Sequence, residues 1–303
     1  MILVFGSINI DLVARVASIP RPGETVLSPR YETLFGGKGA NQAIAAARAS
    51  LPRRVTIAAC VGDDAFGRSA RDNLNRNGVG ADLVTNSTEP TGCAFITVDE
   101  HGENAITVAS GANATLTEAS IRNFGIDAST VAVLQMEVPF PGSLSVARQV
   151  RAVGGRVIWN LAPAPSKFSA TDLSDLVNAT DIFVVNEHEA LAAAALLGRA
   201  TAAFEEAGSF LSRTGCICVV TAGARGAFVF HPNGYRETIE AKPVQPVDTT
   251  GAGDTFVGIL ASSLDEGLPV TTALERACRG ASLACLAHGA QTGMPIREQL
   301  GIA

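Results

Sequence analysis

The apolar residues of this chain gather into short runs, separated by longer segments whose polar and apolar positions follow a helical pattern. The runs are rich in valine and isoleucine, which is typical of strands buried on both faces of a sheet. Predicted strands cover residues 2–8, 54–62, 131–137, 156–160, 181–186 and 216–223, and predicted helices cover 38–49, 66–77, 117–124, 142–153, 187–197 and 201–213. This order indicates an α/β fold with a mostly parallel sheet that is covered by helices on both sides.

Two segments break the alternation. Residues 10–35 and 90–109 alternate in polar character with no helix between their apolar runs, and "DEHGEN" at 99–104 suits a hairpin turn. We expect these segments to form a small β-sheet lid on a single domain that spans residues 1–303. The open edges of such a lid must be paired or covered, and a partner subunit is one way to do that.

Composition and charge exclude several classes of function. The 303 residues carry 23 basic and 29 acidic side chains, a net charge of −6, and no long basic run, which argues against nucleic acid or an anionic membrane as a partner. No apolar run reaches the ~20 residues of a membrane span. The six cysteines form no CxxC pair and the four histidines are scattered. We therefore expect buried free thiols, no zinc or histidine-metal site, and a cytoplasmic location.

Polar residues follow several of the predicted strands. Because the carboxyl ends of parallel strands meet at one edge of a sheet, we expect these residues to converge on a single crevice. Each one could also be an ordinary strand-terminating residue. The residues concerned are Glu137, Asn160, Asn186, Thr221 and Gly223.

The segment "DTTGAGDTF" at 248–256 places two glycines where an apolar helix over 251–264 should begin. Free backbone N–H groups at a helix start bind anions, and glycine lets a phosphate approach the backbone closely. Asp254 would lie in the first turn, where a carboxylate suits a base that takes a proton from a hydroxyl attacking phosphorus. An equally good interpretation of this motif alone is a tight turn with an acid that complements the helix dipole.

A second glycine-led helix start lies at "FGGKGANQA", residues 35–43. Gly37 would let a polar ligand approach the backbone, Asn41 suits a sugar diol, and Lys38 at a helix start suggests a nearby anion. The alternative is an ordinary glycine turn with a surface lysine. Asn9 and Asp11 lie two positions apart, so they share one face of a strand, where sugar hydroxyls or a neighbouring loop would be their partners.

The common alternatives for phosphate and nucleotide binding are missing. The chain has no GxxxxGK[ST] sequence, and "VFGSINI" after the first apolar run lacks the second and third glycines of a dinucleotide-binding turn. The HRD and DFG signatures of protein kinases are also missing.

Taken together, the motifs resemble those of the PfkB, or ribokinase-like, family of sugar kinases, and the resemblance covers essentially the whole chain. "GGKGANQA" and "VDTTGAGDTF" match the two family signatures. The weaker pieces between them occur in the family's order: "GAN" at 111–113, "LQME" at 134–137, "NLAPAP" at 160–165, "NEHE" at 186–189 and "TAGARG" at 221–226.

The resemblance implies a three-layer α/β/α domain with a β lid, often a homodimer through that lid, and ATP-dependent phosphorylation of a sugar hydroxymethyl group. Asp254 matches the catalytic base, and Gly251, Ala252 and Gly253 match the anion hole. Sugar-contacting positions are matched by Asn9, Asp11, Gly37, Lys38, Asn41 and Glu137. ATP-binding positions are matched by Asn186, Thr221, Gly223, Gly226 and Gly253.

The same resemblance implies two kinds of cation. Glu189 matches a position that holds hydrated Mg²⁺. A monovalent-cation site, usually K⁺, is matched by Asp248, Thr250, Ala284, Ala287 and Gly289. Gly293 stands where the family often has a serine ligand, which implies weaker K⁺ dependence. Cys278 stands where an asparagine is often found near the adenine.

The substrate expected on this basis is a small sugar, with D-ribose converted to ribose 5-phosphate as the leading hypothesis. The alternatives within the family are a nucleoside such as adenosine, fructose or 2-keto-3-deoxygluconate. A nucleoside kinase should place an aromatic or apolar base pocket on the lid, for which Phe95 is the one candidate. A non-catalytic sugar or nucleotide sensor would have lost Asp254 or the Gly251–Gly253 turn, and both are intact.

Overall fold

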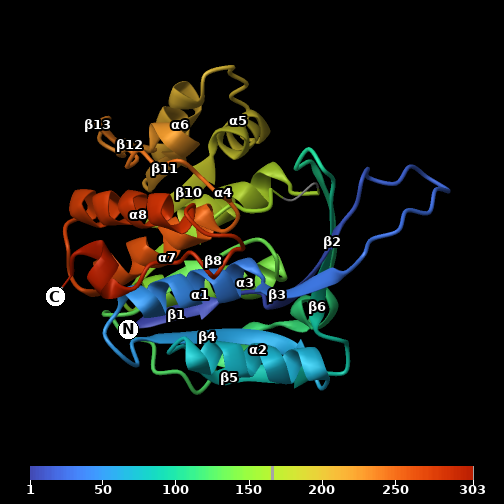
Figure 1. Cartoon of the computed structure of the whole chain (residues 1–303). Coiled ribbons are helices and arrows are strands. Elements are labelled where there is room, and N and C mark those ends of the chain that lie inside the picture. The colour runs from blue at the N-terminus through green and yellow to red at the C-terminus, as the bar shows by residue number, and fades with distance from the viewer. Residues whose placement is uncertain (165–166, 303) are drawn as a thin grey trace.

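A computed structural model describes residues 1–164 and 167–302; the end of the "NLAPAP" motif at 165 lies outside the described residues. A large twisted sheet forms the centre, with strand order β13-β12-β11-β10-β9-β8-β1-β4-β5 (Figure 1). All neighbours pair in parallel except at one edge, where β11–β12 and β12–β13 are antiparallel. The strands are β1 (Ile2–Phe5), β4 (Val55–Gly62), β5 (Gly80–Ser87), β8 (Val131–Leu134), β9 (Arg156–Asn160), β10 (Ile182–Asn186), β11 (Ile217–Thr221), β12 (Ala227–Phe230) and β13 (Arg236–Ile239).

Helices cover both faces of this sheet and create two apolar cores. Alternation along β1 sends Ile2 and Val4 into one core and Leu3 and Phe5 into the other, and all four are fully buried. The first core packs under α1 (Lys38–Ala49), α2 (Ala65–Arg76), α7 (Ala252–Asp265) and α8 (Val270–Ala284). The second packs under α3 (Phe140–Ala152), α4 (Ala170–Asn178), α5 (Glu187–Leu196) and α6 (Phe204–Ser212). The predicted three-layer α/β/α fold is confirmed.

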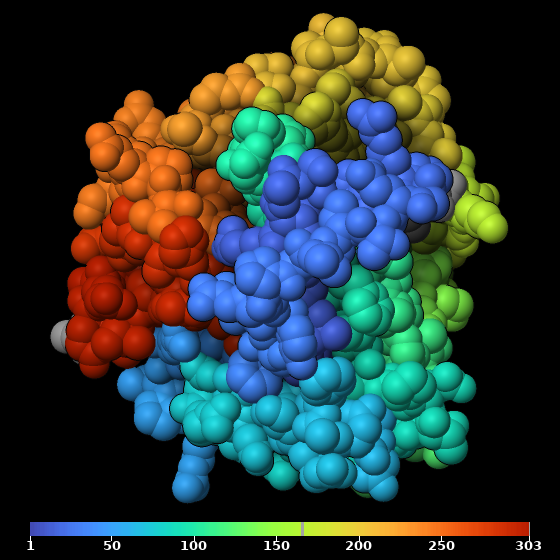
Figure 2. Space-filling model, turned by 45° about the vertical axis from the view of Figure 1, so that its right-hand side comes forward, coloured from blue at the N-terminus to red at the C-terminus, as the bar shows by residue number. Residues whose placement is uncertain are grey.

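A second, four-stranded sheet projects from the main body as a lid (Figure 1). Its order is β3-β2-β6-β7, formed by β2 (Asn9–Arg15), β3 (Tyr31–Gly36), β6 (Gly92–Val98) and β7 (Asn104–Ala109). Figure 2 shows the blue segment that contains β2 and β3 lying across the front of the molecule, beside the orange and red C-terminal elements. No helix in the described residues is both long and apolar enough to cross a membrane.

Some predicted elements are wrong. The predicted first strand over 2–8 ends at Phe5, because the chain turns there and enters the lid sheet at Asn9. The predicted helix over 117–124 is replaced by the short 3₁₀ turn η2 (Glu118–Ile121), which follows a similar turn, η1 (Gly111–Thr115). In η2 only Ile121 is buried, which is too little packing to stabilise an α-helix of eight residues.

Candidate active site

The glycine-led start of α7 forms one wall of the site. Gly251 is the N-cap residue with φ +77°, and a Cβ atom there would lie 2.5 Å from the carbonyl oxygen of Ala290. Only glycine fits this left-handed conformation and this close approach. The amides of Gly253 and Asp254 in the first turn have no carbonyl acceptor within the helix. The turn therefore presents backbone donors and the positive end of the helix dipole, as an anion hole requires.

Asp254 lies beside these donors and is 7% exposed. Asn41 Nδ2 donates to its Oδ2 at 2.9 Å, and Gln42 Nε2 donates to its Oδ1 at 3.0 Å. Both amides come from the first turns of α1, which packs along α7. The two glycine-led helix starts predicted from the sequence thus meet at one carboxylate, in the arrangement that a base for an incoming hydroxyl needs.

The residues expected to hold a sugar surround Asp254 at the junction of the lid and the main sheet. Glu137 Oε2 accepts hydrogen bonds from the Lys38 amide at 3.0 Å and from Ser7 Oγ at 2.5 Å. Gly37 has φ +88°, and a Cβ there would lie 2.6 Å from the Asn9 amide, so the backbone closes tightly here. These contacts bring the start of α1, the end of β1 and the segment after β8 together.

Asn9 is held from a third direction. Asn113 Nδ2 donates to Asn9 Oδ1 at 2.8 Å, and Asn113 also bonds both backbone groups of Ile8. The "GAN" motif therefore fixes the turn at which the chain leaves the main sheet and enters the lid. Sequence reasoning found this motif but gave Asn113 no role.

The charges of Asp254 and Glu137 shift the pKa values of two neighbouring side chains. Burial, with repulsion from Glu137 and Asp254, raises the pKa of Asp11 to about 6. The negative charge of Asp254, and to a lesser extent of Glu137 and Glu189, raises the pKa of Lys38, although burial acts in the opposite direction. Lys38 is therefore a firmly charged cation near the start of α7, which would suit contact with an anionic group held there.

A cavity of about 460 Å³ opens on the other side of Gly253. Thr221 at the end of β11, Gly223 after it, and Ala252 and Gly253 at the start of α7 belong to its lining. Apolar and sulfur-containing side chains line it as well, among them Val244, Cys278, Ala281 and Cys285. A nucleotide with its phosphates at the helix start would find both backbone donors and apolar contacts in this cavity. Gly226 also lines the cavity, as expected for the ATP-binding set.

Asn186 and Glu189 cap the start of α5. Asn186 Oδ1 accepts from the Glu189 amide, and Glu189 Oε2 accepts from the Asn186 amide, both at 2.8 Å. Burial raises the pKa of Glu189, an effect only partly offset by the Asn186 hydrogen bond and the charge of Lys38. A half-buried carboxylate with one oxygen left over fits a hydrated Mg²⁺ nearby, since a cation would stabilise its ionised form.

Asp248 joins the loop before α7 to the loop after α8. Its Oδ1 accepts from the Thr250 amide and its Oδ2 from the Gly289 amide, each at 2.9 Å. Burial opposes ionisation, but the hydrogen bonds from Gly289 and Thr250 outweigh it and hold the pKa of Asp248 below its usual value. An ionised carboxylate with lone pairs to spare, next to loop carbonyls, fits the monovalent cation expected at Asp248, Thr250, Ala284, Ala287 and Gly289.

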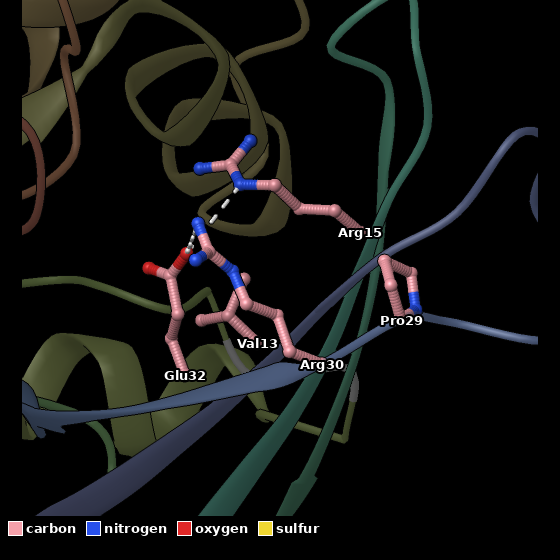
Figure 3. Close-up of a pocket in the computed structure, with 5 residues that line it drawn as sticks. All are labelled: Val13, Arg15, Pro29, Arg30 and Glu32. Atoms are coloured by element: carbon pink, nitrogen blue, oxygen red, sulfur yellow. Dashed lines mark ion pairs between the residues drawn. The ribbon is translucent and has the colours of Figure 1, made fainter.

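A further hollow of about 400 Å³ lies on the lid, away from Asp254 (Figure 3). Val13 and Arg15 line it from β2, and Pro29, Arg30 and Glu32 line it from β3 and the residues before it. The carboxylate of Glu32 lies 3.9 Å from Arg15 Nε and 4.0 Å from Arg30 Nη2. Glu32 thus lies between two exposed arginines of the β2–β3 hairpin, and no predicted site residue is among the residues that line this hollow.

The side chains that sequence reasoning missed are mostly amides. Gln42, Gln135 and Gln291 are buried and bond to the predicted residues or to one another. The available signal was a polar amide inside an otherwise apolar run, as in "VAVLQME", because such a group must find a partner when buried.

Comparison with known proteins gives consistent similarities along the whole chain. The sequence pattern described as pfkB family carbohydrate kinase matches residues 1–297. A ribokinase of Schizosaccharomyces pombe is 36% identical over 97% of this chain and 94% of its own length, and one of Bacillus subtilis is 37% identical over 99% and 97%. The crystal structure of a Thermotoga maritima ribokinase superposes with a TM-score of 0.90 at 31% identity, covering 99% of this chain and 97% of that one. An Arabidopsis thaliana ribokinase complexed with ribose and ATP gives 0.84 at 30% identity, covering 99% and 96%.

Proposed function

This chain belongs to the pfkB family of carbohydrate kinases, and from that premise we propose that it transfers the γ-phosphoryl group of ATP to the hydroxymethyl group of D-ribose. The products are ribose 5-phosphate and ADP. The observation that carries the proposal is the position of Asp254, which contacts the buried amides of α1 on one side and follows Gly253 of a nucleotide-sized cavity, with free helix-start donors beside it. The relatives named ribokinase support the choice of sugar.

The reaction follows from this geometry. A sugar hydroxyl held in the crevice passes its proton to Asp254 while its oxygen attacks the γ-phosphorus, and the bond between that phosphorus and the bridging oxygen of ADP breaks. The Gly253 and Asp254 amides and the Lys38 ammonium stabilise charge on the transferred group. Bound Mg²⁺, which Glu189 would hold through water, neutralises phosphate charge. The Asp248 loop with its cation would order the donors without touching substrate.

The lid geometry favours a free sugar over a nucleoside. Phe95 pairs with Leu12 across β2 and β6, whereas Asp11 pairs with Ala94. Because side chains alternate between the two faces of a sheet, Phe95 lies on the face opposite to Asp11 and its crevice. The single aromatic candidate for a base pocket is therefore directed away from the proposed substrate.

The proposal is tested by measuring ADP release with a panel of acceptors: pentoses, fructose, 2-keto-3-deoxygluconate and adenosine, each with and without K⁺. We expect the highest kcat/KM with D-ribose and some activation by K⁺. A nucleoside or another sugar that outperforms ribose by a large factor would replace the substrate assignment, and no acceptor-dependent release would favour a sensor.

Sugar binding should strengthen as the pH rises through about 6. With the pKa of Asp11 raised to about 6, about a tenth of its carboxyl groups are ionised at pH 5 and nearly all at pH 7.5. Only the ionised carboxylate accepts from sugar hydroxyls with both oxygens, so Kd for ribose should fall up to about tenfold over this range. Calorimetric titration without nucleotide measures this. Asp11→Asn should bind weakly with no such dependence, and an equally steep dependence in that variant would refute the role of Asp11.

The lid also supports a homodimer in this proposal. Tyr31, Leu34, Phe95, Ile106 and Val108 are large apolar lid residues with exposures between 37% and 68%, and β7 is exposed along its whole length. Exposed apolar edges of this kind are commonly covered by a partner. Sedimentation velocity should give twice the 31.2 kDa chain mass. Ile106→Lys should give monomers, while the control Val153→Lys, at an exposed site on the main body, should not. A monomeric wild type at micromolar concentration would contradict the proposal.

A further inference from the structure

A chain of buried side-chain amides surrounds Asp254. Buried polar groups are costly unless they are hydrogen-bonded, so the hydrogen bonds of these amides constrain how they are oriented; of their atoms in the described residues, Gln135 Oε1 has no partner. Every member is at most 9% exposed: Asn41, Gln42, Asn73, Gln135, Asn160 and Gln291. Asn160 belongs to the set because its Oδ1 accepts from Gln42 Nε2 at 3.2 Å.

Asp254 can accept hydrogen bonds at both oxygens only when the first two amides face it in one orientation. An ionised carboxylate only accepts hydrogen bonds, so Asn41 and Gln42 must both turn their NH₂ groups toward it. Their carbonyl oxygens then face away from Asp254, into the protein, where each one needs a donor. Gln135 Nε2 donates to Gln42 Oε1, and Gln291 Nε2 donates to Asn41 Oδ1, each at 2.8 Å.

Gln291 is itself held from outside the crevice. Asn73 Nδ2 on α2 donates to Gln291 Oε1 at 2.8 Å, which leaves the NH₂ group of Gln291 to face Asn41. Arg48 Nη1 on α1 donates to the Gln291 carbonyl oxygen at 2.7 Å and to that of Met294 at 2.9 Å. The segment after α8 is thereby fixed to α1 and α2.

We propose that Gln291 and Gln135 are positioning residues for the base: they determine which way the amides of Asn41 and Gln42 face. Through those amides they hold both oxygens of Asp254, so that its remaining lone pair is directed at the sugar hydroxyl. Neither glutamine contacts substrate. The inference deepens the proposed function and rests on its assignment of Asp254 as the base.

Two substitutions of Gln291 distinguish a role in orienting the Asn41 amide from a purely structural role. In Gln291→Glu the side chain keeps its shape and still accepts from Asn73, but it cannot donate to Asn41. Asn41 should then turn its NH₂ group toward residue 291 and its oxygen toward Asp254, which repels the base. In Gln291→Met the donor is lost, but nothing forces Asn41 to turn.

We expect Gln291→Glu to lower kcat by about 100-fold, the scale of a small misplacement of a catalytic group, and Gln291→Met by less than about tenfold. In both variants, KM for ATP should stay within about twofold of the wild-type value. The assay uses the fastest acceptor of the panel, well below each melting temperature, so an incorrect choice of sugar leaves this test intact. If Gln291→Glu stays within about threefold of wild type, or if Gln291→Met is the slower variant, the inference is overturned.

Two further variants complete the design. Ser262→Ala removes a buried hydrogen bond from Ser50 Oγ, on the same helix as Asp254 but outside the amide chain, and should lower stability with kcat unchanged. Gln135→Glu applies the same reversal to Gln42 and should reproduce the kcat loss if Gln291→Glu does not fold. Two results would show that the amides only stabilise the structure. One is a normal kcat in Gln135→Glu, and the other is a loss of kcat in Ser262→Ala as large as in the glutamine variants.

Discussion

Replacing Asp254 by asparagine is expected to lower kcat by about three to four orders of magnitude, with KM for ATP little changed. An amide cannot take the proton of the attacking hydroxyl. The substitution also places an NH₂ group where Asn41 or Gln42 already donates, so one of those contacts becomes repulsive. Steady-state kinetics of ADP release measures both parameters.

Two companion variants make this result specific. Asp254→Ala removes the base without adding a donor and should be as inactive as Asp254→Asn. Asp265→Asn changes an acid at the far end of the same helix, where Asp265 pairs with Arg54. It should lower stability and leave kcat intact. If kcat for Asp254→Asn is within about tenfold of the wild-type value, Asp254 is not the base.

Gly251→Ala is expected to have the second largest effect, a loss of about 100-fold in kcat. Its Cβ would meet the Ala290 carbonyl oxygen at 2.5 Å, in a conformation with φ +77° that alanine rarely adopts. The turn must shift, and with it the Gly253 and Asp254 amides that stabilise the transferred group. Removing one such donor costs about 3–4 kcal/mol in other enzymes, which a partial displacement would approach.

A matched control lies at the other end of the same helix. Gly267 has φ +82°, and a Cβ there would meet nothing within 4 Å. Gly267→Ala should therefore reduce the free energy of unfolding by about 1 kcal/mol, the cost of the left-handed backbone alone, and keep full activity. Equal kcat values in Gly251→Ala and Gly267→Ala would contradict the anion-hole assignment.

The sequence predicted the two glycine-led helix starts, α1 and α7, but not all of the framework around them. The two glycine-led motifs were recognisable because a helix start encodes its turn, its donors and its acid within a few residues. The antiparallel edge strands β12 and β13 and the helix α8 were not predicted. Their patterns are short or weakly periodic, and their positions depend on packing against elements far away along the chain.

The buried amides around Asp254 could not be predicted for the same reason: their contacts join segments that are far apart along the chain. Asn41 and Asp254 are 213 positions apart, and Gln291 and Asn41 are 250 apart, so only the folded chain brings these side chains together. Local pattern indicated that "GGKGANQA" holds a polar ligand, but it could not indicate that Gln42 contacts the base. Likewise, Phe95 looked like a base-stacking candidate until the register of β2 with β6 placed it on the opposite face of the lid.

The central claim is that Asp254 and the α7 start transfer phosphate to the hydroxymethyl group of ribose, and phosphorus NMR of the reaction product tests it most directly. With ATP, Mg²⁺ and D-ribose, the account predicts one new phosphate-ester signal, split by the two protons of the C5 methylene group, that forms together with ADP. A phosphorus coupled to a single ring proton would place the phosphate on another hydroxyl. Inorganic phosphate alone would mean ATP hydrolysis, and either result would contradict the account.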